Sequence, residues 1–260
     1  MKIGTSIYME KIRENIDFYF DNYDCLEIQD FIMPNNLDDR REILIGEYRQ
    51  ILKEYSGEIS LHSPYVDLNP TSFDPLIKEI STNRYLQIID VAKKLKAKYI
   101  VFHTTLDPRT RYDGYEEFFV EQMISFWRTI VPLVEEHEIV ALMENLHNDS
   151  HRPIKKVIDT IKSPYLGACL DAGHVNAATD TNIGSWVLGY KEALRYIHIH
   201  DNDGSRDQHL PIGEGNLNLN EFFSTLKEIK YDGWMIAELL CGVEGQKKNL
   251  KEIRKRIEEA

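Results

Sequence analysis

The sequence contains few of the features that are typical of secreted or membrane proteins. Its 260 residues include only three cysteines, Cys25, Cys169 and Cys241, and no Cys-x-x-Cys pair. This sparse, odd set argues against a disulfide framework or a cysteine zinc site, so we interpret the thiols as buried small side chains in a reducing compartment. No apolar run approaches the roughly 18 residues that a membrane span needs, and the N-terminus lacks the apolar core of a signal peptide. We therefore expect a soluble, cytoplasmic protein with no membrane contact.

Positive charge is also scarce. Lysine and arginine total 31 against 43 aspartates and glutamates, which gives a formal net charge of −12. Proteins that bind a nucleic-acid backbone usually carry a basic face, because neutralising phosphates supplies most of the affinity. A local basic patch stays open, but nucleic acid is not the partner that we expect. An acidic chain also suits a site in which carboxylates hold a cation.

The chain lacks a Gly/Ser-rich or Pro-rich linker, and its 260 residues match the roughly 250 of one (β/α)₈ barrel. Short apolar runs, typical of buried parallel strands, alternate with longer helical patterns. The eight expected strands are residues 2–7, 26–28, 59–62, 99–103, 139–144, 166–171, 196–200 and 234–238. No Gly-x-Gly-x-x-Gly follows the first strand, which disfavours an open dinucleotide-binding sheet. We predict an α/β fold, a single parallel eight-stranded (β/α)₈ TIM barrel over residues 1–260.

Helical patterns fill most of the intervals between these strands. The pattern at 74–95 begins with Asp74-Pro75, which suits an N-cap followed by proline in the first turn. The expected helices are residues 37–55, 74–95, 115–138, 154–161, 183–194, 219–229 and 247–259.

Acidic residues and histidines stand at or near the ends of seven of the eight expected strands. These residues are Glu27, His62, His103, Glu144, Asp171, His200 and Glu238. In a barrel the carboxyl ends of the strands converge on one rim, where active sites form. Each residue alone is more often structural, but several carboxylates on one rim repel each other and need a neutralising charge. The set therefore predicts a divalent-metal site, and its mixed nitrogen and oxygen ligands suit zinc, manganese, cobalt or iron.

Two loops extend this cluster. The sixth strand is followed by Asp171-Ala-Gly-His174, and the seventh by a segment that contains Arg206 and Asp207-Gln-His209. The spacing of Asp207 and His209 can place both side chains on one side of an extended loop. His198 shares a strand face with His200, and we favour barrel filling as its role.

The constellation resembles the xylose isomerase-like barrel superfamily, which includes sugar isomerases, ketose 3-epimerases and the DNA-repair enzyme endonuclease IV. The likeness runs from Gly4 to Glu238, and its most specific parts are Asp-x-x-His and His-x-His-Asp-Asn-Asp. The epimerase pattern implies one metal ion held by Glu144, Asp171, His200 and Glu238. It also implies that Glu144 and Glu238 are the catalytic acid–base pair. His174 and Arg206 would contact substrate oxygens, and we count His62 with them as substrate-binding.

The endonuclease IV pattern implies three zinc ions and adds His62, His103, His174, Asp207 and His209 to the metal ligands. All nine ligand types are present. Gln208 replaces an arginine of the nuclease pattern, however, and the loop at 29–36 has no basic residue for DNA. Tyr65 stands where the nuclease has a DNA-wedging tyrosine, although sugar-enzyme relatives share it. The Asp207–His209 pair, in turn, is unusual for an epimerase with one metal ion.

The resemblance implies a metal-dependent isomerase or epimerase of a sugar or sugar phosphate that transfers a proton through a metal-bound enediolate. Two alternatives stay open: a metal-dependent phosphodiesterase at abasic DNA, and a non-catalytic barrel that binds a metal or ligand. We expect one to three divalent ions and a small sugar as partner. The sequence leaves open the sugar, the metal and whether the chain forms a homo-oligomer.

Overall fold

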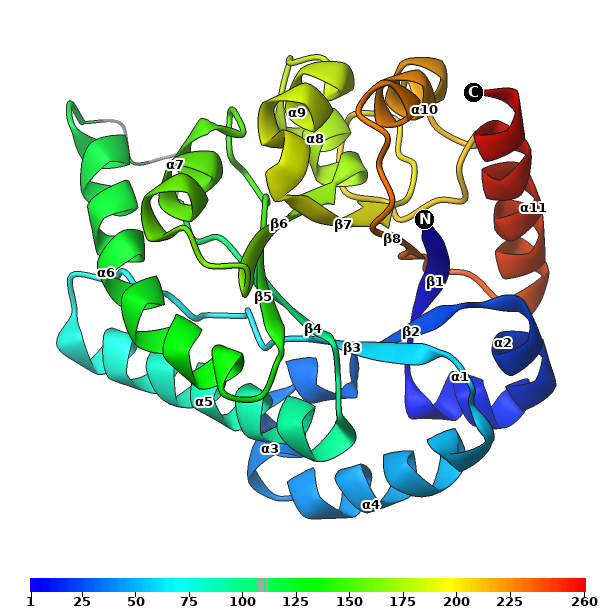
Figure 1. Cartoon of the computed structure of the whole chain (residues 1–260), viewed down its shortest axis with the longest axis horizontal. Coiled ribbons are helices and arrows are strands. Elements are labelled where there is room, and N and C mark those ends of the chain that lie inside the picture. The colour runs from blue at the N-terminus through cyan, green and yellow to red at the C-terminus, as the bar shows by residue number, and fades with distance from the viewer. Residues whose placement is uncertain (107–109, 111) are drawn as a thin grey trace.

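The eight strands close into one parallel barrel, and the helices surround it (Figure 1). This computed structural model describes residues 1–106, 110 and 112–260. The strands are β1 (Lys2–Ile7), β2 (Cys25–Ile28), β3 (Glu58–His62), β4 (Tyr99–His103), β5 (Val140–Glu144), β6 (Leu166–Asp171), β7 (Leu194–Ile199) and β8 (Trp234–Ala237). They are neighbours in chain order, and β1 pairs with β8 to close the ring. The predicted (β/α)₈ barrel is confirmed.

The strand ends lie close to their expected positions. The bounds of β1, β4 and β6 match the sequence pattern, whereas β7 and β8 end one residue earlier than expected. His200 and Glu238 therefore follow their strands directly instead of closing them. Both residues still lie at the carboxyl rim, because the Glu238 N–H donates to the Ile199 carbonyl at 3.3 Å.

The helices differ from the expectation in their number more than in their position. They are α1 (Met9–Glu14), α2 (Ile16–Asn22), α3 (Pro34–Asp38), α4 (Arg41–Ile51), α5 (Pro75–Leu95), α6 (Tyr115–Glu135), α7 (Arg152–Ile161), α8 (Ala172–Ala178), α9 (Ile183–Tyr190), α10 (Leu219–Glu228) and α11 (Val243–Glu259). Three short 3₁₀ turns are η1 (Asp30–Ile32), η2 (Leu52–Glu54) and η3 (Lys191–Ala193). The expected helix at 37–55 is wrong as one element, since α3, α4 and η2 share that segment. The sequence missed α1, α2 and α8 because six or seven residues are too few to establish a helical period.

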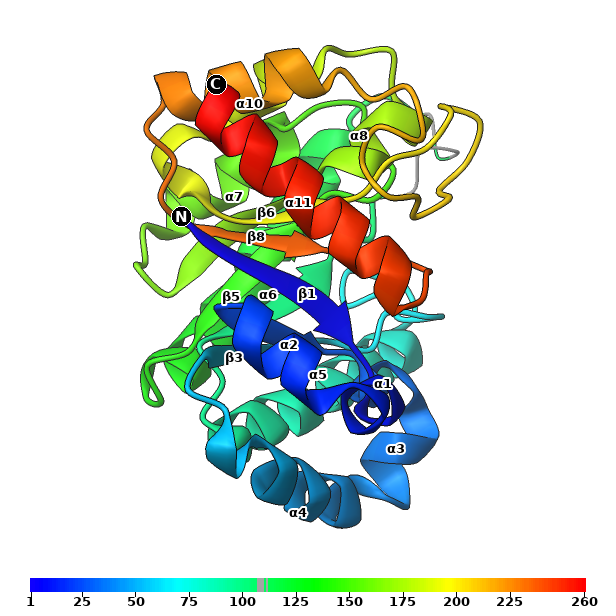
Figure 2. The same cartoon turned by 90° about the vertical axis from the view of Figure 1, so that its right-hand side faces the viewer.

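Two apolar layers hold the barrel. The helices pack onto the outer face of the sheet, and α11 runs alongside β1 in the opposite chain direction (Figure 2). A second cluster that includes Cys25, Cys169, Tyr196 and Trp234 fills the interior below the rim. Cys25 and Cys169 are buried as expected, whereas Cys241 is partly exposed. Within the described residues, no helix combines the length and the apolar character that crossing a membrane requires.

Candidate metal centre

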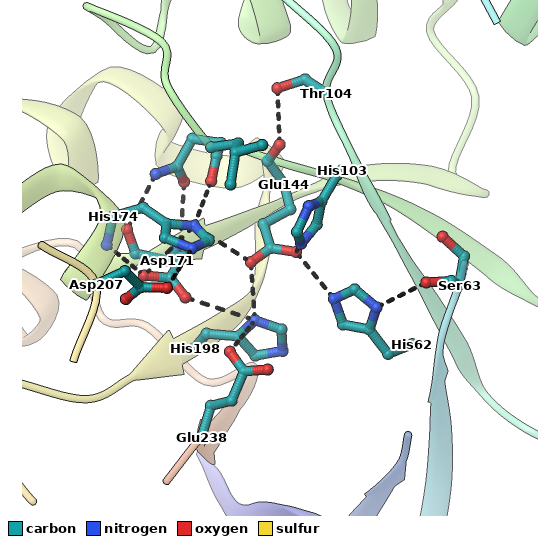
Figure 3. Close-up of polar contacts among 12 residues, drawn as sticks. His62, Ser63, His103, Thr104, Glu144, Asp171, His174, His198, Asp207 and Glu238 are labelled. Atoms are coloured by element: carbon teal, nitrogen blue, oxygen red, sulfur yellow. Dashed lines mark hydrogen bonds and ion pairs between the residues drawn. The ribbon is translucent and has the colours of Figure 1, made fainter. Parts of the chain in front are cut away.

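The carboxyl rim of the barrel brings all nine predicted ligands into one connected cluster of side chains. Figure 3 shows seven of them: His62, His103, Glu144, Asp171, His174, Asp207 and Glu238. Their ligand atoms form overlapping groups whose members lie within 4.8 Å of one another. The groups include His62–His103–Glu144, Asp171–His174–His200, and His200–His209–Glu238. Asp207 joins them through His174, His200 and His209.

Glu144 stands at the centre of the cluster and is fully buried. Its Oε2 atom lies 3.4 Å from His62 Nε2 and 3.2 Å from His103 Nε2. Its other oxygen, Oε1, contacts His198 Nδ1 at 3.0 Å. Burial alone would raise the pKa of Glu144, but the imidazoles of His103 and His198 hold this pKa well below its usual value. Glu144 is therefore a carboxylate at neutral pH, as a metal ligand must be.

The Asp-x-x-His motif begins α8. Asp171 is the N-cap residue, and its Oδ1 accepts a hydrogen bond from the His174 backbone N–H at 2.6 Å. The first helical turn thereby places the His174 ring above the carboxylate that caps it. His200 Nε2 lies 3.1 Å from Asp171 Oδ1 on the other side. Gly173 makes room for this approach, because a Cβ atom there would lie 1.9 Å from the His200 ring.

Asp207 and His209 close the cluster from the loop after β7. His209 Nε2 lies 2.9 Å from Asp207 Oδ2, and the His209 ring stacks on His200 with centroids 4.1 Å apart. His174 Nε2 approaches the same Asp207 oxygen at 3.4 Å. Burial lowers the pKa of His209, but hydrogen bonding to Asp207 outweighs it and raises the value to about 9. The predicted spacing of the pair therefore does place both side chains on one side of the loop.

The donor set fits a divalent metal ion. Two ligand atoms that each lie about 2.1 Å from one tetrahedral ion are about 3.4 Å apart. The separations of 3.4 Å for His62–Glu144, 3.4 Å for His174–Asp207 and 3.5 Å for His200–Asp207 match that spacing better than a hydrogen bond. Glu144 Oε2 is buried and has no hydrogen-bond partner among the described residues. A buried carboxylate oxygen that lies beside two imidazole nitrogens and makes no hydrogen bond to a described residue is the arrangement that an ion would complete.

His198 has a larger role than the sequence suggested. Its Nδ1 atom lies 3.0 Å from Glu144 Oε1 and 3.3 Å from Glu238 Oε2, and both glutamates group with Asp171 around it. Its Nε2 atom lies 2.9 Å from Glu27 Oε2. Three of the four predicted ligands, Glu144, Asp171 and Glu238, thus gather here around His198, while His200 joins two neighbouring groups instead. The expected role of His198 as a residue that fills the barrel is therefore too small, because both of its ring nitrogens contact carboxylates.

A cavity of about 600 Å³ opens above the cluster. Six of the predicted residues line it: His62, His103, His174, Asp207, His209 and Glu238. Glu144, Asp171 and His200 lie beneath them and are fully buried. Tyr65 also lines the cavity and stacks on His103, with ring centroids 4.2 Å apart. Arg206 is exposed and lies outside the described lining, so the geometry gives no support to its expected substrate contact.

Gln29 lines the same cavity, although it was not among the predicted site residues. Its Nε2 atom donates to Glu238 Oε1 at 2.6 Å and holds that carboxylate at the cavity wall. Gln29 follows β2 by one residue, so an amide directly after a strand is the sequence signal that marks its position at the rim.

The family model for the xylose isomerase-like TIM barrel matches residues 21–259. The chain belongs to the xylose isomerase-like TIM barrel family. The uncharacterized protein MJ1311 of Methanocaldococcus jannaschii is 30% identical over 249 residues, which cover 88% of this chain and 77% of that protein. A probable endonuclease 4 of Mycoplasmopsis pulmonis is 26% identical, over 72% of this chain and 71% of its own.

Two solved structures share the whole fold. A D-tagatose 3-epimerase-like protein superimposes with a TM-score of 0.80 at 28% identity, covering 99% of this chain and 97% of its own. The TTHB071 protein of Thermus thermophilus, soaked with ZnCl₂, gives a TM-score of 0.83 at 23% identity and covers 100% and 99%. At 23% identity, the similarity to TTHB071 is evidence for a shared fold alone. The family includes sugar epimerases and isomerases, which supports the interpretation of this chain as an enzyme.

Proposed function

We propose that this chain is a divalent-metal-dependent isomerase or epimerase of a small sugar or sugar phosphate. The observation that carries the proposal is the position of Glu238. This carboxylate lies on the wall of the cavity, directly beside a buried set of imidazole and carboxylate ligands. A substrate in the cavity would therefore meet a proton acceptor and the metal centre at the same point.

We assign the ion to Glu144, Asp171, His200 and Glu238. His198 is a further nitrogen ligand, since it groups with the three carboxylates, while His200 groups separately with Asp171 and with Glu238. His62, His103, His174, Asp207 and His209 would hold additional ions, up to three in all. A bound divalent ion polarises a carbonyl oxygen and so acidifies the neighbouring carbon.

Proton transfer falls to the two glutamates. Gln29 holds one oxygen of Glu238 at 2.6 Å, while the other lies 3.3 Å from His198 Nδ1. Glu144 Oε1 contacts the same nitrogen at 3.0 Å, so the two carboxylates are close neighbours. Glu238 is the member of the pair that lines the cavity, and we assign it the proton abstraction. Glu144 would return the proton, and His174 would donate to the developing oxyanion.

The cavity favours a small substrate over a DNA duplex. Among its described lining residues, Lys11 is the only lysine or arginine. Phosphodiester backbones are bound mainly by several such cations. The relationship to a probable endonuclease 4 keeps DNA incision as the competing activity.

Hydrogen–deuterium exchange tests the proposal even while the product is unidentified. The chain, loaded with manganese, zinc or cobalt, is incubated in D₂O with a panel of ketoses and their phosphates, and deuterium next to the carbonyl is measured. We expect exchange with at least one sugar and a loss of roughly 10²- to 10⁴-fold in Glu238→Gln. Full exchange in Glu238→Gln would refute the assignment. Incision of an abasic-site duplex without any sugar exchange would support the nuclease instead.

A further inference from the structure

Gln246 on α11 presents its side-chain amide to the cavity. The residue is only 4% exposed, yet it lines the cavity. Its Oε1 atom accepts a hydrogen bond from the Tyr23 hydroxyl at 2.9 Å, and Thr5 Oγ1 lies 3.2 Å from the same oxygen. Reversing the carboxamide would turn its NH₂ group toward the buried phenol proton, which would then lose its acceptor. These contacts fix the orientation of the amide.

The amide nitrogen of Gln246 is left for a ligand. It has no hydrogen-bond partner among the described residues. It is not one of the fully buried unpaired atoms, so part of its surface is accessible. Since Gln246 is otherwise buried, that surface opens onto the cavity. A donor that is held in place and left unpaired in a nearly closed site indicates an acceptor on the substrate.

The first turn of α11 lies at the same place. Its N-cap residue is Gly242, which provides no side-chain cap, and both Cys241 and Gly242 line the cavity. A helix of 17 residues presents free backbone N–H groups and the positive end of its dipole at this point. The end of α11 remote from the C-terminus lies near the carboxyl end of β1 (Figure 2). The loop after β8 is also where (β/α)₈ barrels frequently bind phosphate.

Lys11 supplies the cation. It lines the cavity from α1, and its ion pair with Glu14 joins two half-exposed side chains at 3.0 Å. Such exposed pairs are weak, so the ammonium group can turn to a ligand at little cost. The remaining cavity charges are the Asp207 and Glu238 carboxylates and the histidines of the metal centre.

We propose that Gln246, the first turn of α11 and Lys11 form a phosphate subsite, and that the substrate is a sugar phosphate. This inference rests on the proposed function for the carbonyl end of the substrate, which would face the metal centre. The amide and backbone N–H groups would donate to phosphate oxygens, and Lys11 would balance the charge. Because the chain has a net charge of −12, an anionic substrate needs hydrogen-bond donors and a cation gathered at its binding site.

Binding of inorganic phosphate to the chelator-treated full chain, measured by titration calorimetry, tests the subsite without turnover. We expect Gln246→Glu and Lys11→Met each to weaken binding by roughly tenfold or more. Lys255→Met is the matched control, because Lys255 is an exposed residue near the other end of the same helix that pairs with Glu259 and does not line the cavity. It should leave phosphate affinity unchanged. Lys11→Met keeps the test valid if Gln246→Glu does not fold.

The second arm compares D-fructose 6-phosphate with D-fructose on the metal-loaded chain. We expect the phosphorylated sugar to bind roughly tenfold tighter or more, Lys11→Met to remove that advantage, and the control Lys255→Met to keep it. Equal phosphate binding by the wild type and both variants would overturn the inference. So would loss of phosphate binding in His209→Ala alone, since the anion would then lie at the metal centre. Phosphate binding with no deuterium exchange in any sugar would sink the proposed function and leave the subsite standing.

Discussion

His198 Nδ1 lies 3.0 Å from Glu144 Oε1, while the opposite ring nitrogen lies 2.9 Å from Glu27 Oε2. The contact continues downward, because the Tyr196 hydroxyl donates to the same Glu27 oxygen at 2.7 Å. All of these groups are fully buried inside the barrel. A continuous polar column therefore supports Glu144 from below and fixes the direction in which its free oxygen points.

Removing the charge of Glu27 at the base of this column should weaken metal binding. We expect Glu27→Gln to lower the affinity for zinc or manganese by roughly 10- to 100-fold, because His198 loses the carboxylate that orients it. Competition with a chromogenic chelator measures the affinity. The matched control is Glu58→Gln, since Glu58 pairs with Lys2 on a partly exposed part of β3. Equal metal affinity in Glu27→Gln and the wild type would show that the column does not position Glu144.

Metal binding should release protons. Burial lowers the pKa of His174, but the Asp171 and Asp207 carboxylates outweigh it and raise the pKa to about 10. Opposing carboxylates likewise raise the pKa of His209 to about 9. A coordinating imidazole must be neutral, so each of these rings gives up a proton when it binds an ion.

The raised pKa values of His174 and His209 set the direction in which metal affinity changes with pH. Below the raised pKa values the metal competes with protons, so the affinity should increase from about pH 6 to about pH 8. Titration calorimetry in buffers of different ionisation enthalpy counts the protons, and we expect more than one per chain. A pH-independent affinity with no proton release would mean that neither ring coordinates the ion.

Gly173 should tolerate no side chain. A Cβ atom at this position would lie 1.9 Å from the His200 ring, so Gly173→Ala must displace the ring or the start of α8. We expect a loss of about 1 to 3 kcal/mol in the free energy of unfolding, together with weaker metal binding. Gly46→Ala is the control, because Gly46 lies within α4 and a Cβ there meets no atom within 4 Å. That change should stabilise the chain by about 0.5 to 1 kcal/mol. Similar melting temperatures for the two variants would contradict the packing argument.

The fold and the rim were predictable because both follow from periodic patterns. Short β-branched runs recur along the chain, and a polar residue ends nearly every run, so Glu144 and Asp171 could be placed without coordinates. His198 and Glu27 were harder, since the partner of an inward-facing side chain depends on how the barrel closes. Gln246 gives no signal in the sequence, because one amide on an amphipathic helix looks like a surface residue. Arg206 was placed through the resemblance to the epimerase pattern, and a loop can turn a side chain outward at any such position.

Metal content of the purified chain tests the central claim most directly. Elemental analysis after dialysis against zinc, manganese, cobalt and iron counts the bound ions per chain, with Asp171→Asn as the comparison. We predict one to three ions in the wild type and fewer in the variant, since Asp171 caps α8 and contacts His200 at 3.1 Å. A wild-type chain that retains no divalent ion from any of these solutions would contradict the account.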